Sequence, residues 1–362
     1  MALKCGIIGI TSVGKTTIFN CISNTRGETN TYGTGVKANL GVIQVPDKRL
    51  YELEKFQPTE RIVHTTVDIV DIPGLVRGQG DSSGARLLGE IRNTDALIHV
   101  LRCFDDDNLP HIDGSVNPVR DLENVEFELQ VKDVESVVKK IQRLERAAKT
   151  GDKEAKHGVE ILNLYREHLE GFQNASSLEL KPEEKKVVDD IFLLTMKPVL
   201  YVCNVDEASA VDGNRYVEDV RSFLAPRSTE PLVIAGALEA EIANLTEEAD
   251  RLEFLGASGL TEPGVNKLVR AAYRMLNLQT FFTVGPKEIR AWTITAGMTA
   301  PLAAGVIHSD LERGFIRAEV MKYDDFIRLG SEHACREAGK LMVEGKAYVV
   351  GDGDILHIRF NV

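Results

Sequence analysis

The chain has 362 residues, of which 43% are hydrophobic, and its 55 acidic against 43 basic side chains give a formal net charge of −12. This composition predicts a globular protein of two or three domains, and it disfavours sequence-specific DNA as a partner because phosphate neutralisation needs clustered Lys and Arg. The first residues lack the pattern of a signal peptide, and no apolar run reaches the ~20 residues of a membrane span, so we expect a cytoplasmic protein without a membrane partner.

In chain order, strand-like apolar segments alternate with helix-like segments over the first 277 residues. The predicted strands lie at residues 3–9, 64–71, 96–103, 198–204 and 231–235. Such alternation predicts an α/β fold with a largely parallel sheet and helices on both faces. In that architecture, the loops that follow the carboxyl ends of the strands build the ligand site.

Two segments depart from this alternation. Between residues 124 and 195, apolar residues recur at helical spacing among mixed charges and break near Gly151, which predicts an inserted antiparallel helical arm with a third helix over 183–196. Its mixed charges favour a solvated helix face. After residue 278, four strand-like segments surround a predicted helix at 332–338, so residues 279–362 are expected to form a compact α+β module.

The motif with the clearest chemistry is GITSVGKT at residues 9–16, between the first predicted strand and a predicted helix. Glycines at both ends allow backbone N–H groups to point at phosphate oxygens. Lys15 can then reach the β- and γ-phosphates, and the Thr16 hydroxyl can ligate Mg²⁺. A glycine-rich turn with a surface lysine is the simpler alternative.

A second motif ends the predicted strand that precedes Pro73. Asp71 can hold Mg²⁺ through water at the strand end, and the backbone N–H of Gly74 can approach the γ-phosphate. Leu75 follows, where many GTPases place the glutamine that orients the attacking water. Because leucine has no hydrogen-bonding group, we expect slow intrinsic turnover. A strand-ending turn without a ligand is the alternative interpretation.

The loop after the strand at 198–204 reads Asn204-Val205-Asp206-Glu207. GTPases of this plan use Asn-Lys-x-Asp, in which the aspartate accepts hydrogen bonds from N1–H and the 2-amino group of guanine. Here Val205 replaces the lysine and Glu207 the aspartate, and a lost bidentate base contact costs about 1–3 kcal/mol. We therefore expect ATP as the nucleotide. A GTP-hydrolysing enzyme, and an ATP-binding interaction protein with vestigial hydrolysis, remain the alternatives.

Together with RCFDDDN at 102–108, HIDGSVNPVRD at 111–121 and VGPKEIRAWTI at 284–294, these motifs resemble the YchF / Obg-like ATPase family of TRAFAC-class P-loop NTPases over nearly the whole chain. The resemblance implies a Ras-like, OBG-type nucleotide domain over 1–277 that contains a helical (coiled-coil) arm at 124–195. It also implies a TGS domain of ubiquitin-like topology over 279–362. Slow ATP hydrolysis and association with the ribosome are the implied activities.

The resemblance also assigns site residues. The implied phosphate contacts are Ser12, Val13, Gly14, Lys15, Thr16 and Thr17, and the implied base contacts are Asn204, Val205 and Glu207. We predict Lys15, Gly74 and Thr34 as catalytic residues, and Thr16, Asp71 and Thr34 as the magnesium ligands.

Two positions and the second switch at residues 78–84 depart from the family pattern, and the water-orienting residues of that switch are therefore not transferred to this chain. Ser12 stands where the family has an asparagine, so the family's potassium requirement is not carried over to this chain. Gly35 stands where the family has its magnesium-binding threonine, which makes Thr34 the substitute. The histidines form no pair of nucleophile and base, and His99 and His111 are predicted to be structural polar groups.

Overall fold

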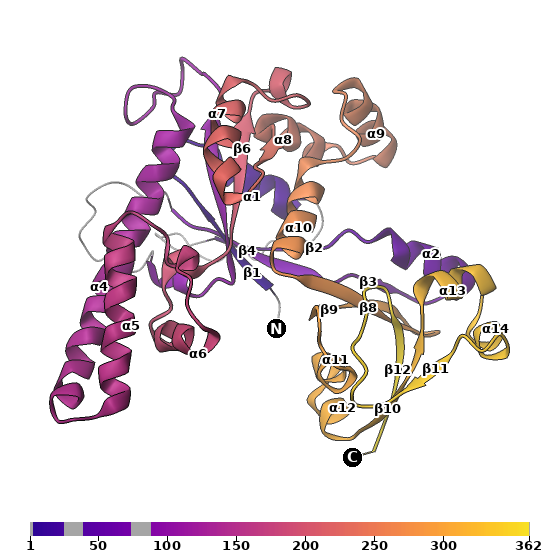
Figure 1. Ribbon diagram of the computed structural model, residues 1–362. Helices are drawn as coiled ribbons and strands as arrows, with labels where there is room; N and C mark the ends of the chain where they lie inside the picture. The colour runs from indigo at the N-terminus through magenta and orange to yellow at the C-terminus, as the bar shows by residue number, and fades with distance from the viewer. Residues whose placement is uncertain (1–2, 25–38, 74–87, 362) are drawn as a thin grey trace. The chain divides into compact units, whose positions relative to one another are not determined.

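The computed structural model describes residues 3–24, 39–73 and 88–361 (Figure 1). Its contacts divide the chain into two compact units. The larger unit comprises Leu3–Gly41 and Asp68–Val265, and the C-terminal unit comprises Val42–Val67 and Asn266–Val362. Within the described ranges, no helix is both long enough and apolar enough to cross a membrane.

A six-stranded sheet organises the larger unit, in the order β2-β4-β1-β5-β6-β7. Its strands are β1 (Leu3–Ile8), β2 (Asn39–Gln44), β4 (Thr66–Asp71), β5 (Ala96–Cys103), β6 (Val199–Val205) and β7 (Leu232–Ile234). The pairs β1–β5, β5–β6 and β6–β7 are parallel. Every residue of β5 is buried, as expected for a strand that is covered on both faces. The predicted α/β sheet is therefore confirmed.

Helices cover this sheet and fix the loops at the carboxyl ends of its strands. They are α1 (Lys15–Asn24), α7 (Arg215–Leu224), α8 (Gly236–Asn244) and α9 (Glu248–Ala257), while α10 (Gly264–Met275) leads into the C-terminal unit. The apolar side chains of α7 and α8 join those of β5 and β6 in one core cluster. Because α1 and α8 each follow the carboxyl end of a strand, α1 after the loop of residues 9–14, their amino termini lie at the edge where ligands bind in such folds.

The predicted helical arm consists of α4 (Pro118–Lys149) and α5 (Lys153–Glu170), which lie side by side in Figure 1 and share an apolar seam. The Asn117 side chain caps the start of α4 with proline in its first turn, and Gly151, at φ +98°, makes the turn that Asp152 follows as the cap of α5. These local signals explain why the two long helices were predictable.

The third helix predicted over 183–196 is wrong as a continuous helix. The chain instead forms α6 (Pro182–Lys185) and two 3₁₀ segments, Lys186–Ile191 and Leu194–Met196, with Phe192 between them at φ +47°. The buried carboxylate of Asp133 on α4 accepts hydrogen bonds from the backbone N–H groups of Leu194 and Thr195, at 2.7 and 2.8 Å. This tertiary contact competes with the helical pattern and interrupts it.

The C-terminal unit contains a second six-stranded sheet, in the order β11-β10-β12-β8-β9-β3. The strands are β3 (Ile62–Val63), β8 (Leu278–Val284), β9 (Ile289–Thr295), β10 (Phe315–Met321), β11 (Met342–Glu344) and β12 (Ile355–Phe360). Its helices are α2 (Lys48–Phe56), α11 (Ala300–Ile307), α12 (Ser309–Arg313), α13 (Tyr323–Leu329) and α14 (Glu332–Glu337). The sequence patterns found the four long strands and α14 but none of the other elements.

The segment Val42–Val67 belongs to the C-terminal unit, which differs from the predicted domain over 1–277. Its β3 pairs in parallel with β9, and Leu50 and Leu53 on α2 are fully buried in the core that contains Phe282. Arg49 binds Asp352 at 2.7 Å and lies over the ring of Phe282. The chain thus leaves the larger unit within β2 and returns to it within β4.

Candidate nucleotide-binding site

The loop between β1 and α1 needs glycine at both ends. Gly9 has φ +145°, and a Cβ atom there would lie 2.5 Å from the carbonyl oxygen of Val100. Gly14 has φ +91°, and a Cβ atom there would collide with Nδ2 of Asn204. Side chains rarely adopt such φ values, so both the backbone conformation and the close packing require glycine. The loop therefore wraps tightly against β5 and β6 before α1 begins.

Lys15 is the first residue of α1, and its side chain folds back over the loop. Its Nζ donates hydrogen bonds to the carbonyl oxygens of Gly9, at 3.2 Å, and Ile10, at 2.5 Å. The residue is only 8% exposed. Burial lowers the pKa of this ammonium group to about 8, against the opposing effect of the Asp71 carboxylate. A phosphate oxygen is a stronger acceptor for it than either carbonyl.

Thr16 and Asp71 meet at the carboxyl edge of the sheet. The Thr16 hydroxyl donates a hydrogen bond to Oδ2 of Asp71 at 3.0 Å. Burial raises the pKa of the Asp71 carboxyl group, while the Thr16 hydrogen bond and the Lys15 charge oppose this shift. A threonine hydroxyl beside a carboxylate at a strand end is the donor set that P-loop NTPases present to Mg²⁺, so these residues fit the ion.

Asn204, the next-to-last residue of β6, links three loops of the site. Its Nδ2 donates to the carbonyl oxygen of Val13 at 2.8 Å, and its Oδ1 accepts from the backbone N–H of Gly236 at 2.9 Å. A Cβ atom at Gly236 would lie 2.9 Å from the same oxygen. Asn204 therefore holds the phosphate loop against the start of α8. Sequence reasoning missed this role, because nothing local connects these three positions.

The other two predicted base contacts, Val205 and Glu207, lie in environments that differ from that of Asn204. The Val205 side chain is buried in the apolar core with Ala235 and Leu238, so it does not face solvent. Glu207 is exposed and begins a 3₁₀ turn, Glu207–Ser209, which the Asp206 side chain caps. A lysine at position 205 would place its charge in this apolar core at a large free-energy cost, whereas valine fits there.

The remaining predicted site residues are placed as follows. Ser12 is exposed at φ +60°, Val13 is buried and Thr17 is half-buried. Thr34 and Gly74 lie outside the described residues, as does Leu75. The structure therefore brings Lys15, Thr16, Asp71 and Asn204 to one edge of the sheet.

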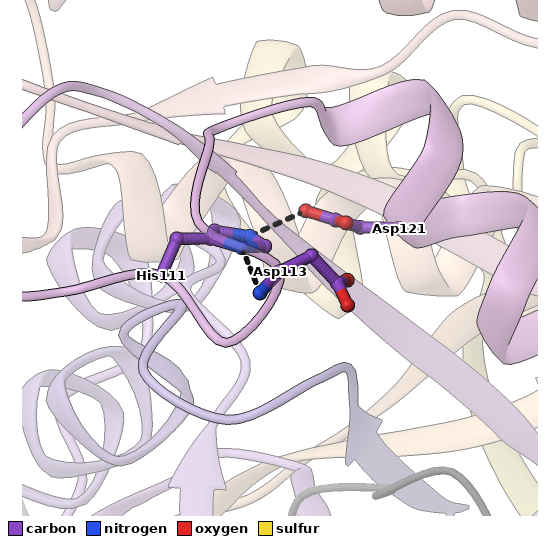
Figure 2. A group of neighbouring side chains, drawn as sticks. All are labelled: His111, Asp113 and Asp121. Atoms are coloured by element: carbon purple, nitrogen blue, oxygen red, sulfur yellow. Dashed lines mark hydrogen bonds and ion pairs between the residues drawn. The ribbon is translucent and has the colours of Figure 1, made fainter.

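A separate polar cluster joins the loop before α4 to the first turn of that helix, and Figure 2 shows its members, His111, Asp113 and Asp121. Nε2 of His111 lies 2.9 Å from Oδ2 of Asp121, and its Nδ1 accepts from the backbone N–H of Asp113 at 3.1 Å. Arg120 donates to the other oxygen of Asp121. Because both ring nitrogens are engaged and a guanidinium group is adjacent, the cluster holds the loop to α4 and is poorly suited to a cation. This arrangement agrees with the structural role predicted for His111.

A glycine-flanked loop between a buried strand and a helix, a buried lysine and a Thr–Asp pair at the sheet edge together define a P-loop nucleoside triphosphatase domain. Residues 4–145 match a family model described as 50S ribosome-binding GTPase, and residues 278–361 match the YchF-GTPase C-terminal family, described as a protein of unknown function. Both matches agree with the α/β domain and the separate C-terminal module.

Curated relatives match along the full chain. The ribosome-binding ATPase YchF of Haemophilus ducreyi is 44% identical and that of Bacillus subtilis 43% identical, each over 100% of both chains. The solved structure of the Schizosaccharomyces pombe YchF GTPase superposes with a TM-score of 0.88 at 32% identity, covering 99% of this chain and 97% of that chain. The chain belongs to the YchF family, which confirms the predicted resemblance.

Proposed function

We propose that this protein binds Mg·ATP, hydrolyses it slowly and acts as a nucleotide-controlled switch on the ribosome. The observation that carries the proposal is the buried Lys15 ammonium group, held inside a glycine-flanked loop beside the Thr16–Asp71 pair. The relatives from H. ducreyi and B. subtilis carry the name ribosome-binding ATPase, which supports both the nucleotide and the partner. Cytoplasmic location and a TGS fold for residues 279–362 stay predictions.

The geometry accounts for phosphate binding as follows. The loop amides and the Lys15 ammonium group bind the phosphate oxygens, and Nζ exchanges its contacts with Gly9 and Ile10 for the stronger anionic acceptor. Thr16 and Asp71 would hold Mg²⁺, which neutralises charge on the phosphate oxygens when bound. Asn204 keeps the loop in place through Val13. Lys15 stabilises the charge that develops as water attacks the γ-phosphate.

The choice of ATP rests on the base loop. The buried Val205 offers no charged group to the base, and Glu207 replaces the aspartate that reads guanine. Adenine presents neither N1–H nor a 2-amino group, so it loses nothing by this change. GTP remains a second candidate because the S. pombe relative and the matching N-terminal family model carry the name GTPase.

Competition binding of ATP and GTP to the full chain with Mg²⁺ tests this proposal. We expect ATP to bind about tenfold more tightly than GTP or better, and Lys15→Ala to abolish binding of both. Equal affinities would refute the ATP preference. Glu207→Asp should shift selectivity towards GTP, and it avoids burying a lysine at position 205. An unchanged selectivity would favour GTP as the natural nucleotide.

Single-turnover hydrolysis, measured with and without ribosomes, separates a slow enzyme from an interaction protein that only binds ATP. We expect turnover above the Lys15→Ala background and faster turnover with ribosomes. Cosedimentation with ribosomes in the ATP and ADP states should differ if the protein is a switch. If the unmodified chain hydrolyses ATP no faster than Lys15→Ala, both with and without ribosomes, ATP is a structural ligand.

A further inference from the structure

The larger unit contains a cavity of about 840 Å³ that is lined by none of the phosphate-loop residues 9–17. This volume lies within the range of about 300–1,000 Å³ that small-molecule sites occupy. Its lining comes from the sheet, from the start of α4, from residues 172–177 after α5, and from the segments 194–199 and 226–229. The cavity therefore lies where the arm joins the sheet, and no function assigned above uses it.

His99 on β5 lines this cavity and is only 1% exposed. Its ring lies 5.8 Å from the ring of Tyr201, but among the described residues no group forms a hydrogen bond with either ring nitrogen. The sequence predicts a structural role for His99, and its nearest aromatic neighbour among the described residues is Tyr201. Because His99 lines the cavity, a ligand bound there can supply a hydrogen-bond partner to its ring.

Burial lowers the pKa of His99 to about 4, against the opposing effect of the Glu126 carboxylate. The imidazole is therefore neutral at physiological pH, with one nitrogen that donates and one that accepts. A neutral ligand that carries both a hydrogen-bond donor and an acceptor complements His99 best, because it can pair with either tautomer of the imidazole.

The charged side chains that line the cavity are already paired. Glu126 accepts hydrogen bonds from the Tyr201 hydroxyl, at 2.8 Å, and from Arg227, at 2.6 and 3.0 Å. Lys197 donates its Nζ hydrogen bonds to the carbonyl oxygens of Arg92, at 3.1 Å, and Thr94. A cationic ligand would find the Glu126 carboxylate already paired with Arg227, and an anionic ligand would have to displace the carbonyl acceptors of Lys197. An uncharged ligand leaves both arrangements intact, so the cavity favours one.

Apolar and aromatic surface makes up much of the remaining lining, including Val125, Leu129 and Val199. Phe172 lines the cavity as well, although the residue is 70% exposed and its backbone has φ +59°. A bulky residue rarely adopts this conformation, and here it keeps an aromatic ring beside the cavity. Flat aromatic molecules pack well against such rings.

We propose that this cavity binds an uncharged aromatic nitrogen heterocycle, which pairs its ring N–H or acceptor nitrogen with His99 and packs its faces against the apolar walls and Phe172. The site is separate from the phosphate loop, and the proposal does not depend on which nucleotide that loop binds. Nucleobases belong to this chemical class, as do many smaller heterocycles.

Benzimidazole is a suitable probe because it is planar and carries one N–H donor and one acceptor nitrogen. We expect saturable binding to the full chain at pH 8, monitored by the ¹⁵N shifts of the His99 ring in histidine-labelled protein. The same titration in the presence of Mg·ADP should give the same affinity. His99→Phe keeps an aromatic ring but removes the hydrogen bond, and it should weaken binding about tenfold, since one hydrogen bond contributes about 1–1.5 kcal/mol.

Met196→Trp, which fills the cavity from another wall, should also weaken binding at least tenfold, and it keeps the test informative if His99→Phe fails to fold. His157→Phe, on the exposed face of α5 outside the cavity, is the matched control and should bind benzimidazole with unchanged affinity. The proposal is overturned if benzimidazole leaves the His99 shifts unchanged, which would indicate a cavity that holds water only. Equal affinity in Met196→Trp and the unmodified chain would overturn it as well.

Discussion

Asn204→Ala tests the central claim about how the phosphate loop is held. The change removes two buried hydrogen bonds and leaves the carbonyl oxygen of Val13 and the N–H of Gly236 without their partner. Each orphaned buried group costs about 1–3 kcal/mol, so we expect the free energy of unfolding of the larger unit to fall by about 2–6 kcal/mol. The loop also loses its restraint, and nucleotide affinity should fall about tenfold or more.

Asn214→Ala is the matched control. Asn214 donates to the carbonyl oxygen of Cys103 at 2.8 Å and caps α7, so its loss also removes partly buried hydrogen bonds from the larger unit. Urea unfolding should show a comparable loss of stability for both variants, whereas equilibrium titration with the nucleotide should show weaker binding only for Asn204→Ala. If both variants bind nucleotide equally well, Asn204 contributes stability alone and does not position the loop.

Three further outcomes follow from the structure. Asp71→Asn should weaken nucleotide binding in the presence of Mg²⁺ and leave binding in EDTA nearly unchanged, as isothermal titration can show. Burial lowers the pKa of Lys15 from its ordinary value of 10.5 to about 8 in the folded chain. Between these two pH values, Lys15 therefore binds a proton in the unfolded chain more fully than in the folded chain. Stability relative to Lys15→Met should therefore rise with pH across that window, and a fall would contradict the buried ammonium group. Arg49→Met should destabilise the C-terminal unit by about 1–2 kcal/mol, since it removes the ion pair with Asp352 and the contact with Phe282, whereas Arg61→Met, which breaks a more exposed ion pair, should cost less in the same urea unfolding experiment.

Local sequence signals were sufficient where the cause of the structure is local. The run at 96–103 predicted β5 to the residue, because a strand buried on both faces is predominantly apolar, and here only His99 and Arg102 interrupt the apolar residues. The glycines of the phosphate loop, followed by Lys15 and Thr16, predicted the site, since the residues that set the loop conformation and those that bind phosphate lie within eight consecutive positions, 9–16. The arm was predictable for the same reason, as capping residues and helical spacing mark α4 and α5.

Tertiary contacts decided what no short segment encodes. The two-residue strand β3 has no periodicity of its own, and its pairing with β9, together with the packing of Leu50 and Leu53 on α2, places Val42–Val67 in the C-terminal unit. Asp133 interrupts the predicted third helix from 61 residues away in the sequence. Asn204 was recognised by its motif, but its hold on Val13 and Gly236 depends on three strand ends meeting. The sequence by itself thus determined the arm, the phosphate loop and every strand of the larger unit's sheet except the edge strand β2. The packing of distant segments determined how that loop is held and where the C-terminal unit begins.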